Sequence, residues 1–353
     1  MKVSLLTIWR EPNLGASLQA YATVRVLTDM GHNVEIVDFR LRRKAKRKGI
    51  ISMLKGALHM CTPYYVKNML FWYRFKQTRR YTDAEDLCNN PPIADLYLLG
   101  SDQVWNPDIT KDNADVYLLN YAPPGKIKAA YASSFGFTTW SYNEHLTKLF
   151  RSRLEAFSRL SCRESDGVKI LKDTFGVSAT HVLDPTLLFN GYPEITGEIK
   201  YKNTLAFYQL NNDTIELEHL AKAKAADLGL KFINVNKKVT LASNYIWNGC
   251  SVKQWLRHIG SSQMVVTHSF HGVAMSIIYK RNFVVVYTEG NRISRIESLL
   301  SRLGLNDRLF RSIKEAAESD IWNIQIDYDD VYEKLACLRK TSYDYIGSIF
   351  VDC

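Results

Sequence analysis

The stretch DLYLLGSDQVWNP, residues 95–107, decides the fold class of this chain. Residues 95–99 form a short apolar run, typical of a strand buried on both faces, and Gly100 ends it. Glycine lets the backbone turn sharply, and a dense group of polar side chains follows. A buried strand that runs into such a turn is typical of the carboxyl edge of a parallel sheet, where ligands bind. The stretch therefore predicts an α/β protein, with either a ligand site or a polar turn around a packed tryptophan at this edge.

The same alternation of short apolar runs with amphipathic segments extends over most of the 353 residues. It predicts helices at 14–30, 142–160 and 293–303, among others, and strands at 3–9, 34–39, 95–99, 126–132, 179–183, 204–210, 231–235, 263–267 and 283–286. Such alternation indicates parallel sheets flanked by helices. We expect one domain at 1–190, a linker near 189–203, a second domain at 200–325, and a C-terminal helix at 326–353 that packs back on the first domain.

The net charge of +10 arises in one part of the chain. Residues 39–82 contain no Asp or Glu but 13 of the 46 Lys and Arg, which leaves 33 basic against 36 acidic residues elsewhere. The run RLRRKAKRK at 40–48 precedes many apolar and aromatic side chains, a composition that favours an anionic lipid surface. A solvated loop with ordinary surface helices is the alternative. We interpret 40–82 as a basic, aromatic insertion that contacts an anionic membrane, and we expect no nucleic-acid partner because no such motif accompanies the charge.

The six cysteines are scattered, and no Cys-x-x-Cys pair occurs. This spacing argues against a zinc knuckle, a redox pair and a disulfide framework, and it fits a reducing cytoplasm. No run approaches the roughly 20 apolar residues of a membrane-spanning helix, and the chain does not start with a signal-peptide pattern. We expect a cytoplasmic protein, peripheral at the inner face of the plasma membrane.

Three further clusters follow expected strands or open an expected helix. NLGASLQAY at 13–21 opens the first helix, where free N–H groups attract an anion, although capping by Asn13 accounts for it equally. YASSFG at 131–136 ends a strand with two hydroxyls and a glycine. SCRES at 161–165 presents Arg163, whose planar fork suits a phosphate, a carboxylate or an ion pair with Glu164.

The stretch VVTHSFHG at 265–272, in the second half of the chain, has the same pattern as residues 95–107. An apolar strand runs into two histidines and a glycine, and a helix follows. Imidazole works as an acid or base near neutral pH, so His271 is a candidate for that role, while we interpret His268 as structural. Two histidines without further ligands do not predict a metal site.

Together and in this order, the clusters resemble the polysaccharide pyruvyl transferase family. The resemblance spans roughly residues 3–310 and includes VLDPT at 182–186. It implies two Rossmann-like domains in a glycosyltransferase-B-like arrangement with a cleft between them, the first on the acceptor side and the second on the donor side. It also implies transfer of pyruvate from phosphoenolpyruvate, a co-substrate, to a galactose- or mannose-type sugar of a cell-surface polysaccharide or its lipid-linked precursor. The product is a pyruvyl ketal, and neither a metal nor another cofactor is required.

The resemblance also implies roles for particular residues. His271 would exchange protons with the donor, and Asp102 would orient or deprotonate sugar hydroxyls. Better-known members carry an arginine where this chain has Ser269, so either another cation replaces it or the donor has changed. The expected donor-binding residues are Arg163, Ser269, Arg292, Arg295 and Lys280. The expected acceptor-binding residues are Asn13, Gly15, Gln19, Ser101, Gln103, Trp105, Asn106, Ser133 and Ser134.

Two other classes of function stay open at this point. A glycosyltransferase of the same architecture would use a sugar nucleotide and would need an acidic group for the ribose, for which Glu289 is the nearby candidate. A non-catalytic protein that binds polysaccharide or membrane is favoured by the missing arginine at position 269.

Overall fold

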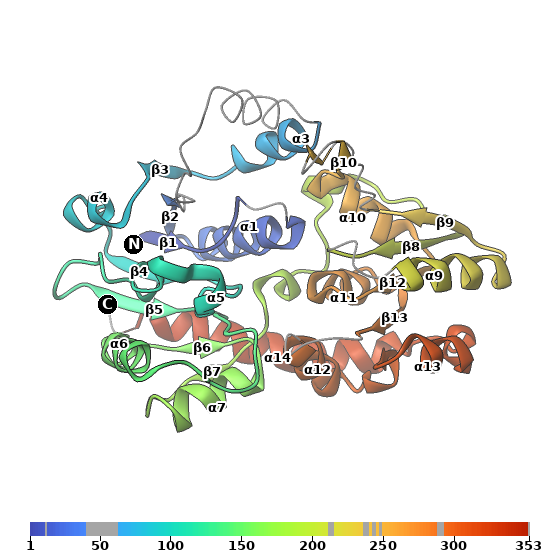
Figure 1. Cartoon of the computed structure of the whole chain (residues 1–353). Helices are drawn as coiled ribbons and strands as arrows, with labels where there is room; N and C mark the ends of the chain where they lie inside the picture. Colours follow the sequence, from blue (N-terminus) through green and yellow to red (C-terminus); the bar gives the residue numbers. More distant parts are fainter. Residues whose placement is uncertain are drawn as a thin grey trace.

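Two five-stranded parallel sheets organise the chain in a computed structural model (Figure 1). The structure describes residues 1–10, 13–39, 63–210, 215–235, 240–241, 245–246, 249–287 and 293–351. The strand order is β3-β2-β1-β4-β5 in the first sheet and β14-β13-β12-β8-β9 in the second. The predicted α/β class with parallel sheets is therefore confirmed.

The first sheet comprises β1 (Lys2–Leu6), β2 (Asn33–Phe39), β3 (Gln77–Tyr81), β4 (Leu96–Leu99) and β5 (Ile127–Ala130). A short parallel pair, β6 (Ser161–Cys162) and β7 (Thr180–His181), continues it through a bridge between Ser133 and Cys162. The helices of this half are α1 (Leu14–Asp29), α3 (Pro63–Trp72), α4 (Ala84–Asn89), α5 (Pro107–Thr110), α6 (Glu144–Leu154) and α7 (Ser165–Asp173), with the 3-10 turns η1 (Lys111–Asn113) and η2 (Val116–Leu118).

The second sheet comprises β8 (Thr204–Tyr208), β9 (Lys231–Asn234), β12 (Met264–Thr267), β13 (Asn282–Val286) and β14 (Leu309–Phe310). A small antiparallel pair, β10 (Thr240–Leu241) and β11 (Tyr245–Ile246), lies apart from it. The helices of this half are α9 (Ile215–Asp227), α10 (Val252–Ser261), α11 (Phe270–Ile278), α12 (Ser294–Leu303) and α13 (Ile313–Glu318), with η5 (Asn306–Arg308) and η6 (Asp320–Asn323). Between the halves lie η3 (Pro185–Leu188) and α8 (Pro193–Thr196).

Apolar burial explains why these segments form central strands. Every residue of β4, β12 and β13 is buried, as expected for parallel strands covered by helices on both faces. In register, Val3 of β1 lies opposite Leu96 of β4, and Ala206 of β8 lies opposite Val265 of β12. One continuous apolar core contains residues from both sheets, so the two halves pack against each other directly.

The last helix, α14 (Tyr328–Ile349), contacts both halves of the molecule (Figure 1). Toward the first half, the Tyr345 hydroxyl donates to the carbonyl of Ala130 at 2.7 Å. Toward the second half, the Tyr332 hydroxyl donates to the carbonyl of Ile278 at 2.8 Å. The helix therefore ties the two sheets together along one side.

Several expected boundaries require correction. The strand expected at 3–9 ends at Leu6, because the Thr7 side chain leaves the sheet to donate to the carbonyl of Ser101 at 2.8 Å. The helix expected at 142–160 extends over Glu144–Leu154, and Asn143 caps its start.

Two interpretations of longer segments also change. Within the expected insertion 40–82, residues 77–81 form β3 at the edge of the first sheet, because β2 offers a free edge for pairing. Residues 40–62 lie outside the described part of the chain. The expected linker 189–203 contains α8, where Glu194 accepts from Arg25 of α1 at 2.9 Å. Among the described helices, none is both long and apolar enough to span a bilayer.

Candidate active site

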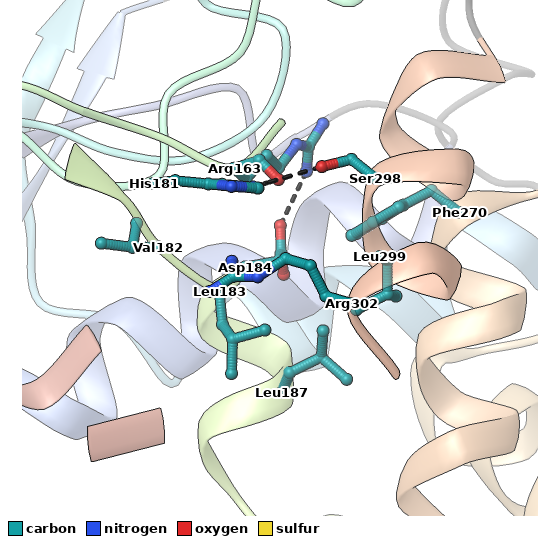
Figure 2. Close-up of a pocket in the computed structure, with 10 residues that line it drawn as sticks. All are labelled: Arg163, His181, Val182, Leu183, Asp184, Leu187, Phe270, Ser298, Leu299 and Arg302. Carbon is teal, nitrogen blue, oxygen red and sulfur yellow. Dashed lines mark hydrogen bonds and ion pairs between the residues drawn. The ribbon is translucent and has the colours of Figure 1, made fainter. Parts of the chain in front are cut away.

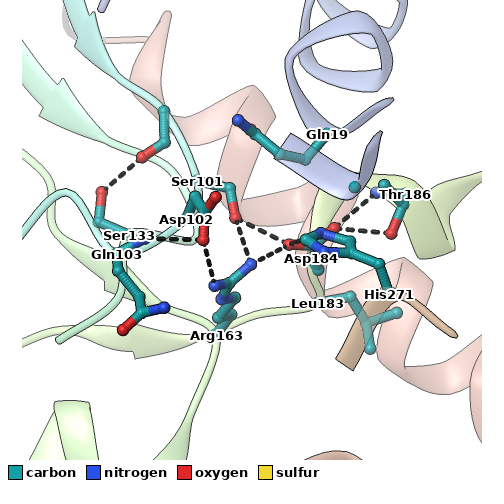
Figure 3. A network of polar contacts seen from close by, with 12 residues as sticks. Gln19, Ser101, Asp102, Gln103, Ser133, Arg163, Leu183, Asp184, Thr186 and His271 are labelled. Carbon is teal, nitrogen blue, oxygen red and sulfur yellow. Dashed lines mark hydrogen bonds and ion pairs between the residues drawn. The ribbon is translucent and has the colours of Figure 1, made fainter. Parts of the chain in front are cut away.

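The carboxyl ends of β4, β5 and β6 meet in one buried polar cluster (Figure 3). Asp102, directly after β4, bridges to Ser133 beyond β5, and Ser133 bridges to Cys162 of β6. Asp102 has a φ of 75°, and Ala132 has a φ of 53°. Left-handed backbone at non-glycine residues is unfavourable and is tolerated where the surrounding structure imposes it. The strand ends are thus held in tight turns that direct polar groups toward the second half.

Arg163 lies at the centre of this cluster and is paired with two carboxylates. Its guanidinium donates to Oδ1 of Asp102 at 2.9 Å and to Oδ2 of Asp184 at 2.7 Å. Burial opposes the charge on Arg163, yet the two carboxylates outweigh that effect and raise the pKa of the guanidinium. Both terminal nitrogens of Arg163 are hydrogen-bonded to carboxylates of the chain, while its Nε has no hydrogen-bond partner among the described residues, and its role toward a donor anion stays a prediction. Glu164, the ion-pair partner that the sequence also suggested, has Oε2 at 4.0 Å from Nε of Arg163 and accepts from the backbone N–H of Phe135 at 2.9 Å.

Asp184 connects several segments of the cluster. Its Oδ2 accepts from Ser101 Oγ at 2.8 Å as well as from Arg163, and its Oδ1 accepts from the hydroxyl of Thr186 at 2.7 Å. Burial disfavours the carboxylate, but His271 and Arg163 lower the pKa of Asp184 to about 2. Asp184 was not among the expected site residues. The sequence feature that could have identified Asp184 is its position in VLDPT, at the end of a buried strand and before a proline.

His271 approaches this cluster from the second half of the molecule. It lies in the first turn of α11, is 3% exposed, and has Nε2 at 3.8 Å from Oδ2 of Asp184. Burial lowers the pKa of His271 to about 4, against the opposing influence of Asp184. Its Nε2 has no hydrogen-bond partner among the described residues. The imidazole is therefore neutral near pH 7 and has one nitrogen available.

Gly15 makes the approach of His271 possible. A Cβ at this position of α1 would collide with the imidazole ring of His271. Glycine is needed here for close approach, whereas the expected role of Gly15 in binding a sugar stays a prediction. The start of α1 and the start of α11 thus meet at the junction between the halves.

Arg295 is the cation of the second half that reaches the cluster. It lies in the first turn of α12, and it is close enough to Arg163 and Asp102 for both to influence its charge. Burial and the neighbouring Arg163 lower the pKa of Arg295 to about 10. Among the described residues it forms no ion pair, and its Nε lacks a hydrogen-bond partner. Arg295 is therefore a partly buried cation that forms no ion pair with a carboxylate of the described chain.

The other expected donor-binding residues lie in different places. Lys280 is exposed and stacks on the ring of Tyr332 in α14 at 4.5 Å, so it points away from the cluster. Ser269 is buried at the start of α11, and its hydroxyl has no partner among the described residues. Arg292 lies outside the described residues. Of the expected donor-binding cations that the structure describes, Arg163 and Arg295 lie at the cluster, whereas Lys280 lies against Tyr332 of α14.

Most of the expected acceptor-binding residues form hydrogen bonds or packing contacts within the loops. Trp105 is 0% exposed and packs on Phe135 with ring centroids 5.2 Å apart, so it offers no platform for a sugar. Asn13 caps α1 by accepting from the N–H of Gly15 at 3.0 Å, and Gln19 donates to Thr7 at 2.9 Å.

The polar residues after β4 and β5 have similar local partners. Ser133 donates to the carbonyl of Gly100 at 2.9 Å, and Asn106 accepts from the N–H of Asp108 at 3.0 Å and donates to Gln103 at 3.1 Å. Ser101 donates to Asp184, and Ser134 is buried without a partner among the described residues. Buried backbone and side-chain polar groups require partners, and these side chains supply them.

A small cavity lies beside the cluster, between the two halves (Figure 2). Its volume is ≈ 10 Å³, which is room for about one water molecule. Its walls include His181 and Asp184 from the first half and Phe270, Ser298 and Arg302 from the second. The ring of His181 contacts Ser298 Oγ at 3.2 Å and the carbonyl of Arg163 at 3.3 Å. Within the described residues, no group of three or more His, Cys, Asp or Glu side chains is arranged to hold a metal ion.

The lowered pKa values of His181 and His271 predict that the folded protein loses stability in acid. Burial lowers the pKa of both His181 and His271 from 6.5 to about 4, so the unfolded chain binds protons in this window that the folded chain does not. Stability is therefore present above pH 6.5 and is lost as the pH falls toward 4, by up to roughly 3 kcal/mol per histidine. Urea midpoints measured from pH 7 to 4 should fall, and His181→Gln should flatten the curve. The exposed His145 provides the control, since His145→Gln should leave the slope unchanged; a flat curve for the unmodified protein would contradict the prediction.

Comparison with known proteins agrees with this architecture. The family model described as polysaccharide pyruvyl transferase matches residues 13–290. A search of the curated proteins finds no match to this chain. Among solved structures, a UDP-N-acetylglucosamine 2-epimerase from Listeria monocytogenes is 12% identical with a TM-score of 0.50, covering 100% of this chain and 97% of that one. An alpha-glucosyltransferase in complex with UDP is 8% identical with a TM-score of 0.48, covering 98% and 95%.

The structural likeness concerns the fold alone. It agrees with the two parallel sheets and with the predicted pair of Rossmann-like domains in a glycosyltransferase-B-like arrangement. The family match extends over most of the chain, from the start of α1 through α11 and β13. It includes the polar strand ends of the first half and the histidine of the second. The chain belongs to the polysaccharide pyruvyl transferase family.

Proposed function

We propose that this protein transfers pyruvate from phosphoenolpyruvate to a sugar and forms a pyruvyl ketal. The observation that carries the proposal is the place of Arg295, a cation without an ion-pair partner in the described chain, beside the Asp102–Arg163 pair. Phosphoenolpyruvate carries a phosphate and a carboxylate, and a guanidinium binds both groups through charge-assisted hydrogen bonds. Arg295 thus takes the place of the arginine that is missing at Ser269.

In the proposed reaction, His271 donates a proton to the methylene carbon of the donor. A sugar hydroxyl bonds to the neighbouring carbon and gives up its proton, and the bond from that carbon to the phosphate oxygen breaks. A second hydroxyl of the sugar bonds to the same carbon and completes the ketal. Of the two hydroxyl protons, one returns to His271 and the other leaves on the phosphate.

We expect the bound donor to raise the pKa of His271, so that the imidazole carries the proton that the reaction needs. The pKa of His271 is about 4 because of burial, so the imidazole is neutral in the structure. Bringing two anionic groups next to it favours the protonated form and raises the pKa. Asp102 orients the sugar hydroxyls; its pKa stays low despite burial because Arg163 and His271 stabilise the carboxylate.

We propose that the junction opens to admit the substrates. The cavity beside the cluster has room for about one water molecule, much less than a phosphoenolpyruvate molecule needs. Beside the continuous apolar core, polar contacts also cross the junction between α12 and α7, such as the hydrogen bond of 2.6 Å from Ser294 Oγ to Asp166. When contacts with the donor replace these hydrogen bonds, α12 can separate from α7.

The acceptor we propose is a galactose- or mannose-type sugar of a cell-surface polysaccharide or of its lipid-linked precursor. The family name supports a polysaccharide acceptor in general. The reaction would take place in the cytoplasm, at the inner face of the plasma membrane, and phosphoenolpyruvate would be the co-substrate without a further cofactor.

The direct test incubates the protein with phosphoenolpyruvate and either a lipid-linked or a synthetic galactoside. Release of phosphate together with a gain of one pyruvyl ketal in the mass of the acceptor is the expected result. Two outcomes would overturn the proposal. If a sugar nucleotide raises the melting temperature while phosphoenolpyruvate does not, the protein is a glycosyltransferase. If no donor is consumed and the polysaccharide still binds, it is a non-catalytic binding protein.

A prediction about Arg295 tests the proposed donor contact. Arg295→Ala should raise the KM for phosphoenolpyruvate by roughly 10- to 100-fold, because a charge-assisted hydrogen bond contributes about 1.5–3 kcal/mol. Arg295→Lys should retain part of the affinity, since it keeps the charge and loses the planar fork. Lys280→Ala is the matched control and should leave KM unchanged, because Lys280 stacks on Tyr332. An unchanged KM in Arg295→Ala would refute the donor contact.

A further inference from the structure

Helix α3 attaches to the first half of the molecule through one face. The Trp72 indole donates to Ser17 of α1 at 2.9 Å, and the ring of Phe71 packs against Tyr21 of α1 at 5.6 Å. Directly after the helix, Phe75 packs on the ring of Trp9 at 5.4 Å. These contacts fix which side of α3 faces outward.

The outward face of α3 is apolar. Val66, Leu70 and Tyr73 are 42%, 68% and 69% exposed. The N–H of Tyr73 donates to the carbonyl of Met69 at 3.1 Å, so the helical path continues to this residue. With about 100° per residue, side chains at these spacings lie within an arc of roughly 60°. Three large apolar side chains therefore form one ridge on the surface of the molecule.

Unpaired cations border this ridge. Lys67 and Arg74 are exposed and lie on the same side of it, and neither forms an ion pair with a residue that the structure describes. By contrast, Arg79 is paired with Asp86 and Arg80 with Asp38. The sequence adds that residues 39–82 contain no acidic side chain. The ridge thus combines exposed apolar side chains with an uncompensated positive border.

We propose that the outward face of α3, formed by Val66, Lys67, Leu70, Tyr73 and Arg74, docks on an anionic lipid surface. A helix with an apolar ridge and basic flanks lies in the plane of a membrane, with its apolar side chains among the acyl chains and its cations at the phosphates. A second copy of this chain fits less well, because its ridge would bring equal positive charges together.

The position of α3 connects this surface with the candidate active site. Ser17 of α1 contacts Trp72 of α3, and Gly15, two residues earlier, contacts His271. Asn68 of α3 also accepts from the N–H of Val252 at the start of α10, so the helix touches the second half as well. If the proposed lipid-linked acceptor is correct, docking through α3 would hold the lipid near the junction of the halves. The docking itself does not depend on the reaction.

The test measures binding of the full chain to vesicles of phosphatidylglycerol and phosphatidylcholine, with vesicles of phosphatidylcholine alone as the comparison. The protein should bind the anionic vesicles at low salt and release them at high salt. The Leu70→Ser/Tyr73→Ser and Lys67→Gln/Arg74→Gln double variants should each lower the partition coefficient by about tenfold or more. Leu70→Phe should retain binding. Ile93→Ser, at an exposed apolar residue elsewhere, and Lys126→Gln are the matched controls and should bind as the unmodified protein does.

Three outcomes would overturn the proposal. The first is that the unmodified protein fails to bind anionic vesicles at low salt. The second is that the α3 variants, with unchanged melting temperatures, bind as well as the controls. The third is that the variants change the molecular mass in solution and leave vesicle binding unchanged, which would assign the ridge to a contact between copies. A soluble galactoside assay, which needs no membrane, reports separately on the proposed reaction.

Discussion

Replacing His271 by alanine is expected to lower kcat for phosphate release by roughly 100- to 10,000-fold, the range that a positioned proton donor contributes. The imidazole is the proposed acid–base group, and it lies beside the Asp102–Arg163–Asp184 cluster with Nε2 at 3.8 Å from Asp184 and no hydrogen-bond partner among the described residues. Turnover with phosphoenolpyruvate and a galactoside would be measured in single-turnover and steady-state assays.

Two controls separate catalysis from folding in this experiment. His271→Gln keeps a polar side chain of similar length and should be as inactive as the alanine variant while melting near the unmodified protein. His268→Asn alters the neighbouring, partly exposed histidine and should retain turnover. Near-normal activity of His271→Ala would eliminate the proposed role. The pKa of His271, followed by NMR, should rise from about 4 when phosphoenolpyruvate is added.

Replacing Asp184 by alanine is expected to cause the largest loss of stability. Oδ2 of Asp184 accepts from Arg163 at 2.7 Å in a fully buried pair, and its removal leaves Arg163 with Asp102 alone as a hydrogen-bonded carboxylate and takes the acceptor away from the hydroxyls of Ser101 and Thr186. Breaking a buried pair from one side costs about 3–5 kcal/mol. The free energy of unfolding in urea should fall by this amount, and turnover should fall with it because Asp184 also faces His271.

The chain offers a matched control for this variant. Asp115 pairs with Arg153 at 2.6 Å, but both side chains are partly exposed, so Asp115→Ala should cost less than about 1 kcal/mol. The Arg163→Met/Asp184→Leu double variant should cost less than the sum of the single changes, because both single changes remove the same hydrogen bond, although Asp102 also loses its partner when Arg163 is replaced. Asp184→Ala should also move the pH profile of kcat toward acid, since Asp184 raises the pKa of His271. Equal losses for Asp184→Ala and Asp115→Ala would contradict the central role of the buried pair.

Local patterns were sufficient to predict most of the central strands. The apolar runs at 95–99, 204–210 and 263–267 became β4, β8 and β12 within a few residues, because a strand buried on both faces requires such a run. The edge strand β3 was missed because Gln77–Tyr81 is polar and its pairing with β2 depends on contacts distant in sequence. Expected helices were displaced at their ends, where caps such as Asn143 decide the boundary.

The candidate site was predicted less completely than the fold. The sequence located the strand-end clusters and His271, which the structure brings close to one another. It assigned Arg163 and Trp105 to ligands, whereas Arg163 pairs with Asp102 and Asp184 and Trp105 is enclosed in the core. Asp184, which contacts Ser101, Arg163 and Thr186, was noted only as part of a motif.

By itself, the sequence determined that this protein is an α/β chain with parallel sheets, that polar clusters follow the buried strands, and that the order of those clusters is that of the polysaccharide pyruvyl transferases. The tertiary structure decided which polar side chains bind partners within the described chain and which, such as Arg295, form no ion pair there. The physical reason is distance along the chain. Periodicity reports on neighbours a few residues apart, whereas Arg163 and Asp102 are separated by 61 residues, and their pairing exists only after the two strand ends are brought together.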